Sequence, residues 1–259
     1  MIKYGSQDLF TPNKIFFIGD VHGSIDEMES VIEQIEAEIT PLDHIVFLGD
    51  LINRGPDSPG VLVCLRDLRN KYPGQVFVTR GNHEHMLLMY LSGGNTSWMN
   101  QPYSRDTLNQ FQQFYNLPTI TPQSLKEALE KDGILEVINS FLPYYETEKV
   151  IASHAPLDYT VLMIHGIDHY EEDLNDPDCD PKPRPILDKL EYELMWQFAD
   201  EERELKHIKK FHICGHQFKH HKQPRIFKTR AYIDTGCGAV AGKPLTCLVY
   251  PSKKIIQSK

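Results

Sequence analysis

The chain has 259 residues, of which 41% are hydrophobic and 10% aromatic, enough to bury a sizeable core in one α/β domain. A formal net charge of −9 argues against the backbone of a nucleic acid as the main partner. No apolar stretch reaches membrane-spanning length, residues 1–14 lack the regions of a signal peptide, and the five cysteines show no CxxC spacing. We therefore expect a cytoplasmic protein with no membrane partner, disulfide framework or zinc ribbon.

The first predicted element is a strand at residues 15–18, where four apolar residues in a row are typical of a strand buried on both faces. The strand stops at Gly19, and Asp20, His22 and Gly23 follow. The glycines let the backbone turn and leave room for a bound ion or anion. On its own, this pattern is equally typical of a polar turn between a strand and a helix.

The next elements alternate between helix and strand. Apolar residues at helical spacing predict a helix over 24–38, which Ser24 would cap, and a second helix that Pro59 opens and Ser58 would cap. Strands are predicted at 45–48 and 76–79, and a further helix at 84–91. This β-α-β-α-β order favours parallel pairing of the three strands.

Polar residues follow five of the predicted strands at the point where each strand ends. Besides Asp20 and His22, they are Asp50, Asn82, His154 and His216. Open α/β sheets bind their ligands at the carboxyl ends of strands. Five such strand ends indicate one shared site rather than separate turns.

Residues 92–149 interrupt the alternation. They are polar and aromatic, and a capping box from Ser124 to Glu127 predicts a helix through about residue 141. We interpret this segment as a helical insertion beside the face that carries the site. Its aromatic residues, including Trp98 and Tyr103, either line that site or only pack a small core of the insertion, and the sequence favours neither alternative.

The second half of the chain returns to strands. They are predicted at 150–152, 161–164, 211–214, 231–233 and 245–250, with a largely helical stretch at 187–209. The acidic run at 168–180 is typical of a solvated loop, with a recognition loop for cationic peptides as the alternative.

The motifs at these strand ends resemble a known family. Gly19-Asp-Val-His-Gly23, Gly49-Asp-Leu-Ile-Asn-Arg-Gly55 and Gly81-Asn-His-Glu84 are similar to the three signature motifs of calcineurin-like metallophosphoesterases. Within that superfamily they resemble the serine/threonine phosphoprotein phosphatase branch, which includes bacterial and phage protein phosphatases and symmetrical diadenosine tetraphosphatases. Three later motifs fit the same pattern, so the resemblance spans roughly 14–250: Ser153-His-Ala155, Gly215-His-Gln217 and Ile233-Asp-Thr-Gly236.

The resemblance implies an α/β fold, a four-layer sandwich of two mixed β-sheets flanked by helices. It also implies two divalent metal ions, which can activate a water and neutralise phosphoryl oxygens when they lie roughly 3.5–4 Å apart. Asp20, His22 and Asp50 would hold the first metal, with Asp50 bridging to the second. Asn82, His154 and His216 would complete the second site. This mixed oxygen and imidazole set suits Mn²⁺, our preferred candidate, or Fe or Zn²⁺. His165 also follows an apolar run and is the alternative to His154.

Arg54 is expected to clamp the phosphate, since a guanidinium fork matches two phosphoryl oxygens. Arg80 is a weaker candidate. In the family, the histidine at the position of His83 protonates the leaving oxygen and is oriented by an aspartate. Here that position is Asn53, which offers no charge. A neutral partner favours leaving groups that need little protonation, such as those of phosphoanhydrides and aryl phosphates.

A further arginine that is common in the family is absent after Leu194-Met-Trp196, and Arg184 or Arg203 are the candidates to replace it. His212, His220 and His221 lack a comparable frame, and we expect them to take no part in the site.

We therefore expect a metal-dependent hydrolase of phosphoric monoesters, with a serine/threonine protein phosphatase of bacterial or phage type as the preferred interpretation. The alternative is a hydrolase of diadenosine tetraphosphate or other dinucleoside polyphosphates, which Asn53 favours. A remote alternative is a metal-binding interaction module without catalysis. The expected partner is a phosphorylated protein or a small phosphoester or nucleotide.

Overall fold

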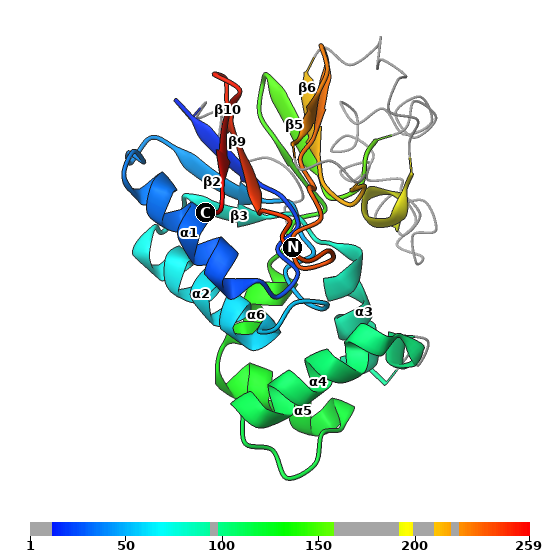
Figure 1. Cartoon of the computed structure of the whole chain (residues 1–259). Coiled ribbons are helices and arrows are strands. Elements are labelled where there is room, and N and C mark those ends of the chain that lie inside the picture. The colour runs from blue at the N-terminus through cyan, green and yellow to red at the C-terminus, as the bar shows by residue number, and fades with distance from the viewer. Residues whose placement is uncertain (1–11, 94–97, 158–191, 199–209, 219–222) are drawn as a thin grey trace, which may run out of the picture.

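The computed structural model describes residues 12–93, 98–157, 192–198, 210–218 and 223–259. Within these ranges, the strands form two five-stranded sheets (Figure 1). The first sheet has the order β10-β9-β1-β2-β3. Its strands are β1 (Ile15–Ile18), β2 (His44–Phe47), β3 (Val76–Val78), β9 (Thr246–Tyr250) and β10 (Lys254–Gln257). β1, β2 and β3 are parallel, whereas β9 and β10 pair antiparallel, so the sheet is mixed.

The second sheet has the order β4-β5-β6-β8-β7. Its strands are β4 (Tyr144–Glu146), β5 (Val150–Ser153), β6 (Phe211–Cys214), β7 (Arg225–Ile226) and β8 (Arg230–Tyr232). β5, β6 and β8 are parallel, and the two outer strands run antiparallel to their neighbours. Each sheet therefore has three parallel strands side by side, and the expected pair of mixed sheets is confirmed.

Alternation along β1 explains how the layers pack. Ile15 and Phe17 point into a core shared by the two sheets, whereas Phe16 and Ile18 point into the core beneath the helices. All four side chains are at most 2% exposed, as the apolar run predicts. Full burial of such a side chain is worth roughly 1.5–3 kcal/mol, so this strand is a main contributor to both cores.

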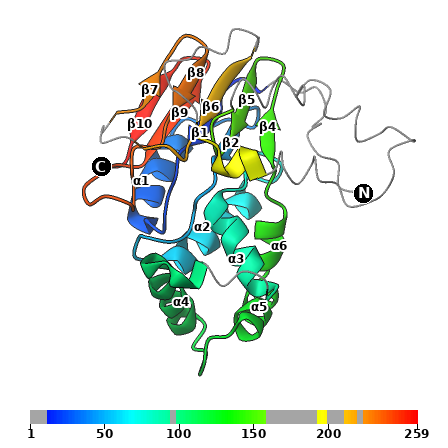
Figure 2. The ribbon, with the colours of Figure 1, turned by 90° about the vertical axis from the view of Figure 1, so that its right-hand side faces the viewer.

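Helices α1 (Ile25–Glu36) and α2 (Ser58–Lys71) cover the outer face of the first sheet (Figures 1 and 2). The predicted stripes are buried, for example Met28 and Ile35 in α1 and Leu62 and Leu65 in α2. Ser24 is at the predicted N-cap position of α1, whereas the cap expected at Ser58 is wrong. Ser24 makes no side-chain bond to α1, and Asp57 rather than Ser58 caps α2 by accepting from the Gly60 amide at 2.8 Å. The Ser58 hydroxyl instead accepts from the backbone amide of Asn53, at 3.0 Å.

Helix α3 (Asn82–Leu91) begins two residues earlier than predicted and runs from the sheet towards the insertion (Figure 1). The insertion contains η1 (Trp98–Asn100), α4 (Pro102–Phe114), α5 (Pro122–Lys131) and α6 (Ile134–Asn139). The single helix expected from Ser124 is wrong: Thr121 caps α5, and Gly133 breaks the helix with a left-handed φ of 73°.

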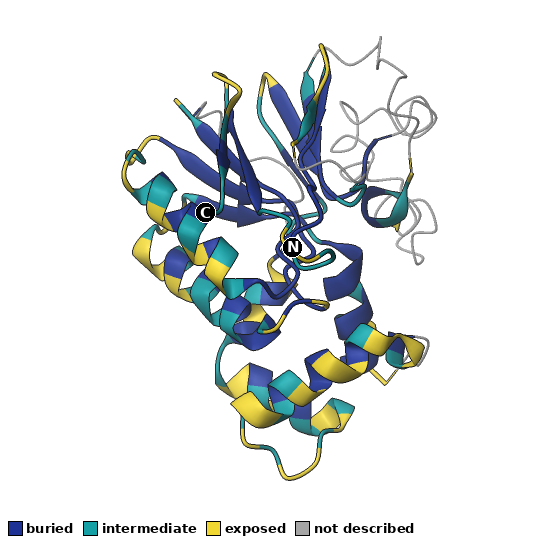
Figure 3. Ribbon diagram, viewed as in Figure 1, coloured by how far each residue is buried: buried dark blue, intermediate teal, exposed yellow. Residues whose placement is uncertain are grey.

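The aromatic residues of the insertion divide between two roles. Trp98 and Phe111 are fully buried in the core that α1 and α2 share with the first sheet, so they do not form a separate core of the insertion. Tyr103 instead packs against His83, with ring centroids 5.1 Å apart. Figure 3 shows the buried strands and loops above these helices, whose outer faces are exposed.

Other differences concern short elements. β7 and β10 were not expected, because two and four residues with exposed positions give no clear period. Residues 192–196 are helical, in agreement with the prediction. The predicted strand at 161–164, the acidic run and the remainder of 187–209 lie outside the described ranges. Among the described helices, none is both long and apolar enough to cross a membrane.

Candidate metal centre

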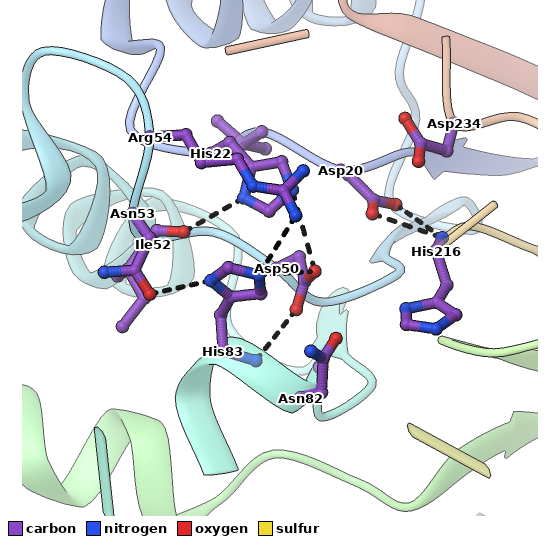
Figure 4. Close-up of polar contacts among 12 residues, drawn as sticks. Asp20, His22, Asp50, Ile52, Asn53, Arg54, Asn82, His83, His216 and Asp234 are labelled. Carbon is purple, nitrogen blue, oxygen red and sulfur yellow. Dashed lines mark hydrogen bonds and ion pairs between the residues drawn. The ribbon is translucent and has the colours of Figure 1, made fainter. Parts of the chain in front are cut away.

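The parallel strands of both sheets direct their carboxyl ends to one place. Asp20 and His22 follow β1, Asp50 follows β2, and Asn82 follows β3. From the second sheet, His154 follows β5 and His216 follows β6. Figure 4 shows these side chains, His154 excepted, around Asp50. The structure therefore brings together all six residues that the sequence proposed as metal ligands.

The backbone at the site is strained in a consistent way. His22, Asp50, Asn53, Arg54 and His216 all have positive φ between 46° and 72°, and only two other non-glycine residues in the described ranges do. A left-handed conformation costs a non-glycine residue roughly 1–3 kcal/mol and persists where surrounding contacts enforce it. Here it turns the side chains back towards one point immediately after each strand.

Glu84 supplies part of that enforcement. Its buried carboxylate accepts from the backbone amides of Asp50 at 3.0 Å, Leu51 at 2.8 Å and Gly81 at 3.2 Å. Burial, followed by the charge of Asp50, raises the pKa of Glu84 to about 7. A Cβ at Gly81 would lie 2.3 Å from both the Asp50 amide nitrogen and its Oδ1, so only glycine lets the two loops approach so closely.

Two imidazoles are oriented by backbone carbonyls. His22 donates from Nδ1 to the Ile52 oxygen at 3.1 Å, and His154 donates from Nδ1 to the Leu48 oxygen at 2.6 Å. Both rings therefore direct Nε2 towards Asp50, at 3.6 Å from Oδ2 and 3.4 Å from Oδ1 respectively. Metal-binding histidines usually make this kind of N–H bond on the side away from the metal.

Atoms able to bind a metal also gather around His154 Nε2. His154 Nε2 lies 3.0 Å from Asn82 Oδ1 and 3.1 Å from His216 Nδ1. Hydrogen bonding alone would favour the opposite orientation of the Asn82 amide, with its nitrogen 3.0 Å from His154 Nε2 and 3.2 Å from Asp50 Oδ2. A metal ion in this place would instead bind the Asn82 oxygen, which rotation of the amide presents on the same side.

The pKa values indicate that this cluster attracts one positive charge. Burial alone would lower the pKa of His154, but the charge and hydrogen bond of Asp50 outweigh it and raise the pKa to about 10. Burial lowers the pKa of His22 to about 4 and that of His216 to about 3, so both present unprotonated nitrogens. A cation among these atoms would replace the proton on His154, and the donor set therefore fits a divalent metal.

Asp20 contributes a second carboxylate, which accepts from the backbone amide of His216 at 3.1 and 3.2 Å. A Cβ at Gly215 would lie 2.1 Å from Asp20 Oδ1, so the chain passes directly over this carboxylate. Two compact groups of metal-binding atoms occur in the described part of the chain: His22 with Asp50 and His83, and Asp50 with His154 and His216. Asp20 lies outside both groups.

Asp234 is a site residue to which the sequence analysis gave no role. It follows β8, is 6% exposed, and accepts from the Gly236 amide at 2.8 Å. Burial raises its pKa to about 6, and burial together with the charge of Asp234 raises the pKa of Asp20 well above its usual range. Two adjacent buried carboxylates favour a cation nearby. The signal was present, because Asp234 also stands at the end of a predicted strand.

His83 is held differently from the histidines above. Its Nδ1 donates to Asn53 Oδ1 at 2.7 Å, and its Nε2 lies 3.5 Å from an Arg54 guanidinium nitrogen, from which it accepts (Figure 4). Because a guanidinium repels a cation, we do not interpret His83 as a metal ligand, although its Nε2 is 3.7 Å from Asp50 Oδ2. Burial places its pKa well below its usual range, against the opposing charge of Asp50.

Asn53 is itself fixed by the insertion. Its Oδ1 also accepts from Trp98 Nε1 at 3.3 Å, and its amide nitrogen donates to Thr107 Oγ1 at 2.7 Å. Thr107 in turn donates to the Tyr103 carbonyl at 2.9 Å. Sequence reasoning missed both Trp98 and Thr107 as partners of Asn53.

An open pocket of about 360 Å³ gives access to these groups. It is lined by side chains from both sheets and from two later segments: His22, Asp50, Arg54, Asn82, Phe198, His216, Gln217 and Phe218. The Arg54 side chain therefore reaches a space that also borders Asp50 and Asn82. An anion in this space could contact the Arg54 guanidinium while it lies next to the candidate metal ligands.

The remaining candidates lie elsewhere. Arg80 donates to the Phe141 carbonyl at 3.5 Å and does not line the pocket. His212 is buried in the second sheet, where its Nε2 bonds the Ser153 hydroxyl at 3.1 Å. The alternatives outside the described ranges are His165, Arg184, Arg203, His220 and His221.

A mixed oxygen and imidazole cluster beside an arginine, at the ends of parallel strands, defines the class of metal-dependent phosphoesterases. The family model of the calcineurin-like phosphoesterases matches residues 13–233. The chain belongs to this family.

Two curated relatives are symmetrical bis(5'-nucleosyl)-tetraphosphatases. The protein from Erwinia tasmaniensis is 29% identical over 146 residues, which cover 54% of this chain and 43% of the relative. The one from Baumannia cicadellinicola is 40% identical over 77 residues, which cover 29% and 25%. The matched segments therefore span less than half of the length of these relatives. A protein serine/threonine phosphatase structure from Saccharomyces cerevisiae has a TM-score of 0.56 at 16% identity, covers 96% of this chain and 81% of its own, and shows likeness of fold alone.

Proposed function

We propose that the protein hydrolyses phosphoanhydrides of nucleotides, of the dinucleoside tetraphosphate class. The observation that carries this proposal is the 2.7 Å contact from His83 Nδ1 to the neutral amide oxygen of Asn53. An amide accepts the hydrogen bond but, unlike a carboxylate, does not stabilise an imidazolium. Leaving groups that need little protonation are then favoured, and the phosphate oxygen released from an anhydride is such a group. The two curated tetraphosphatases support the same substrate class.

Asp20, His22 and Asp50 would hold one divalent metal, and Asp50, Asn82, His154 and His216 the other, with Mn²⁺ as the preferred ion. When bound, the metals supply an activated water and neutralise charge on the phosphoryl oxygens. Asp50 is placed to bridge, because its Oδ2 faces His22 and its Oδ1 faces His154.

Arg54 would bind the phosphoryl oxygens as a fork. Its guanidinium is 5.8 Å from the centre of the Tyr103 ring and next to His83 Nε2. Tyr103 of the insertion and His83 of α3 therefore limit the directions in which the guanidinium can point. His83 is held in the tautomer with a proton on Nδ1, and its Nε2 faces the substrate side. We assign it the role of an acceptor that positions the Arg54 guanidinium beside the phosphoryl oxygens.

A serine/threonine protein phosphatase, preferred from the sequence, now ranks second. Release of a seryl alkoxide needs a proton, and the Asn53–His83 pair is poorly suited to supply one. The interaction module without catalysis has lost its support, because the family is one of hydrolases and the candidate ligands are brought together. We further propose that the chain works as one domain, residues 1–259 with the insertion at 92–149, in the cytoplasm.

The test is an activity panel with added Mn²⁺ on diadenosine tetraphosphate, a phosphoserine peptide and an aryl phosphate. We expect the tetraphosphate to have the highest kcat/KM. Higher kcat/KM on the phosphoserine peptide would replace this proposal with the protein phosphatase. Product analysis by chromatography separates symmetrical cleavage, which yields only nucleoside diphosphate, from asymmetrical cleavage.

A further inference from the structure

Phe198 has the largest exposed fraction, 67%, among the large hydrophobic side chains that the structure describes. It lies at the pocket that contains Asp50 and Arg54, and its ring centroid is 4.9 Å from that of His216. An isolated exposed phenylalanine needs no explanation, but one that lines a pocket together with Asp50 and Arg54 does.

The backbone before Phe198 is anchored to the rest of the structure. Leu194 and Met195 of the preceding helical turn are buried, and the Leu194 carbonyl accepts from the Ala155 amide at 2.7 Å. Ala155 directly follows His154, so the segment that carries Phe198 is tied to the metal centre itself. The backbone that leads to Phe198 is therefore anchored next to His154.

A second ring borders the same pocket. Phe218 follows His216 by two residues, and a Cβ at Gly236 would lie 3.1 Å from its Cδ2. The ring thus rests against the bare backbone of Gly236, whose φ of +87° also favours glycine. The same Cβ would lie 3.6 Å from Lys243 Cγ, so a basic side chain is close to this ring.

We infer that Phe198 and Phe218 form a subsite for a planar aromatic group, namely the nucleobase of the substrate. Both rings line the pocket that also contains Arg54 and Asp50, and the Phe198 ring lies against His216, so one ligand with phosphates and a flat ring would contact the rings and the phosphate-binding groups together. Stacking on a phenylalanine is sequence-tolerant because every base has a π-face, so adenine and guanine should both bind. This inference deepens the proposed function and rests on it.

The experiment compares a substrate that has bases with one that has none. Wild type and Phe198→Ala are assayed on diadenosine tetraphosphate and on inorganic tripolyphosphate. Removal of a stacking ring should lower kcat/KM for diadenosine tetraphosphate by roughly 5- to 150-fold. The value for tripolyphosphate should change by less than about twofold, because it makes no stacking contact. Phe198→Trp should retain the preference for the base-bearing substrate.

The matched control is Tyr192→Ala. Tyr192 is an exposed aromatic residue of the helical turn that precedes Phe198, but it stacks on Trp196 and does not line the pocket. This variant should hydrolyse both substrates as wild type does. Equal losses on the two substrates in Phe198→Ala, or no loss on either, would overturn the subsite.

A separate measurement distinguishes failure of the subsite from failure of the proposed function. If wild type hydrolyses an aryl phosphate but no anhydride, the proposed function is wrong. Inhibition of aryl phosphate hydrolysis by ADP and by pyrophosphate then tests the subsite alone. Stronger inhibition by ADP that Phe198→Ala abolishes would retain the subsite, and equal inhibition by the two compounds in wild type would remove it.

Discussion

The hydrogen-bond chain from His83 to Tyr103 decides which atoms face the substrate. Thr107 uses its proton on the Tyr103 carbonyl, so its oxygen accepts the Asn53 amide nitrogen. The Asn53 oxygen is thereby turned towards His83 and Trp98, which both donate to it. One amide orientation satisfies all four groups, and that orientation places His83 Nε2 beside Arg54.

The first prediction concerns the missing charge. Asn53→Asp should raise turnover of a phosphoserine peptide more than turnover of an aryl phosphate, because only the peptide releases a strongly basic alkoxide. General acid help is typically worth about 10²–10⁴ in rate, so even partial recovery is measurable by steady-state kinetics.

Metal content of Asn53→Asp must be measured in parallel, since a new carboxylate near Asp50 is able to draw in a cation. With metal content unchanged, equal effects on both substrates would mean that Asn53 does not tune His83. Substrate preference would then have to originate elsewhere, with the insertion as the first candidate.

The second prediction separates His154 from His165. His154→Ala removes a buried imidazole whose Nε2 is within 3.4 Å of Asp50, Asn82 and His216 atoms, so it should lose or weaken one of two metals. His165→Ala should retain the wild-type metal stoichiometry. Metal analysis after dialysis gives the answer, and the reverse pattern would show that His165 is the ligand.

At the scale of single residues, the sequence was sufficient to predict the positions where a motif places a metal-binding residue type at the end of a strand. All six proposed ligands converge for that reason. The partners of Asn53 could not be predicted, because Trp98 and Thr107 lie 45 and 54 residues away. They also belong to a segment that shows no clear strand pattern. Phe198 is also invisible in sequence, since nothing local distinguishes it from a core aromatic.

At the scale of elements, the site depends on how strands end and how the insertion docks. The strands predicted within the described ranges and the stripes of α1 and α2 were correct because apolar runs and 3.6-residue spacing report burial directly. Caps and breaks were less predictable: Asp57 competes with Ser58 for the same position, and Gly133 ends α5 only because it adopts positive φ. Which of two neighbouring residues caps or ends a helix depends on tertiary contacts, and the local sequence does not show these contacts.

The third prediction tests whether α4 acts on the site. Thr107→Val keeps the shape of the side chain but removes the acceptor of the Asn53 amide, so His83 should be less well oriented. One such hydrogen bond is worth roughly 0.5–1.5 kcal/mol, which corresponds to a fall in kcat of about 2- to 13-fold with KM nearly unchanged. Thr107→Ser should restore kcat.

Ser104→Ala is the matched control for Thr107→Val. Ser104 is a buried hydroxyl on the same helix, for which the described structure gives no hydrogen-bond partner. Its removal should leave kcat unchanged. A loss of kcat in Ser104→Ala as large as that in Thr107→Val would indicate a general effect of α4 on stability, which thermal denaturation of both variants would reveal.

At the scale of the whole molecule, the candidate metal centre joins the two sheets. Asp20, Asp50 and Asn82 come from the first sheet, whereas His154 and His216 come from the second. Hydrogen bonds already cross this boundary, from His154 to the Leu48 carbonyl at 2.6 Å and from the His216 amide to Asp20. A metal bound here would add bonds between the sheets, so occupancy should be coupled to stability of the fold as well as to catalysis.

The last prediction is therefore a paired one. Exhaustive chelation should abolish hydrolysis and lower Tm, and Mn²⁺ should restore both. A ligand at 100 times its Kd stabilises by about 2.7 kcal/mol, which for a chain of this size corresponds to a rise in Tm of roughly 5–10 °C. The His154→Ala variant is the internal control, because it should show a smaller shift on addition of Mn²⁺. Undiminished turnover after chelation would contradict the two-metal site. Full loss of activity without a change in Tm would instead mean that the metals act on the substrate and do not hold the two sheets together.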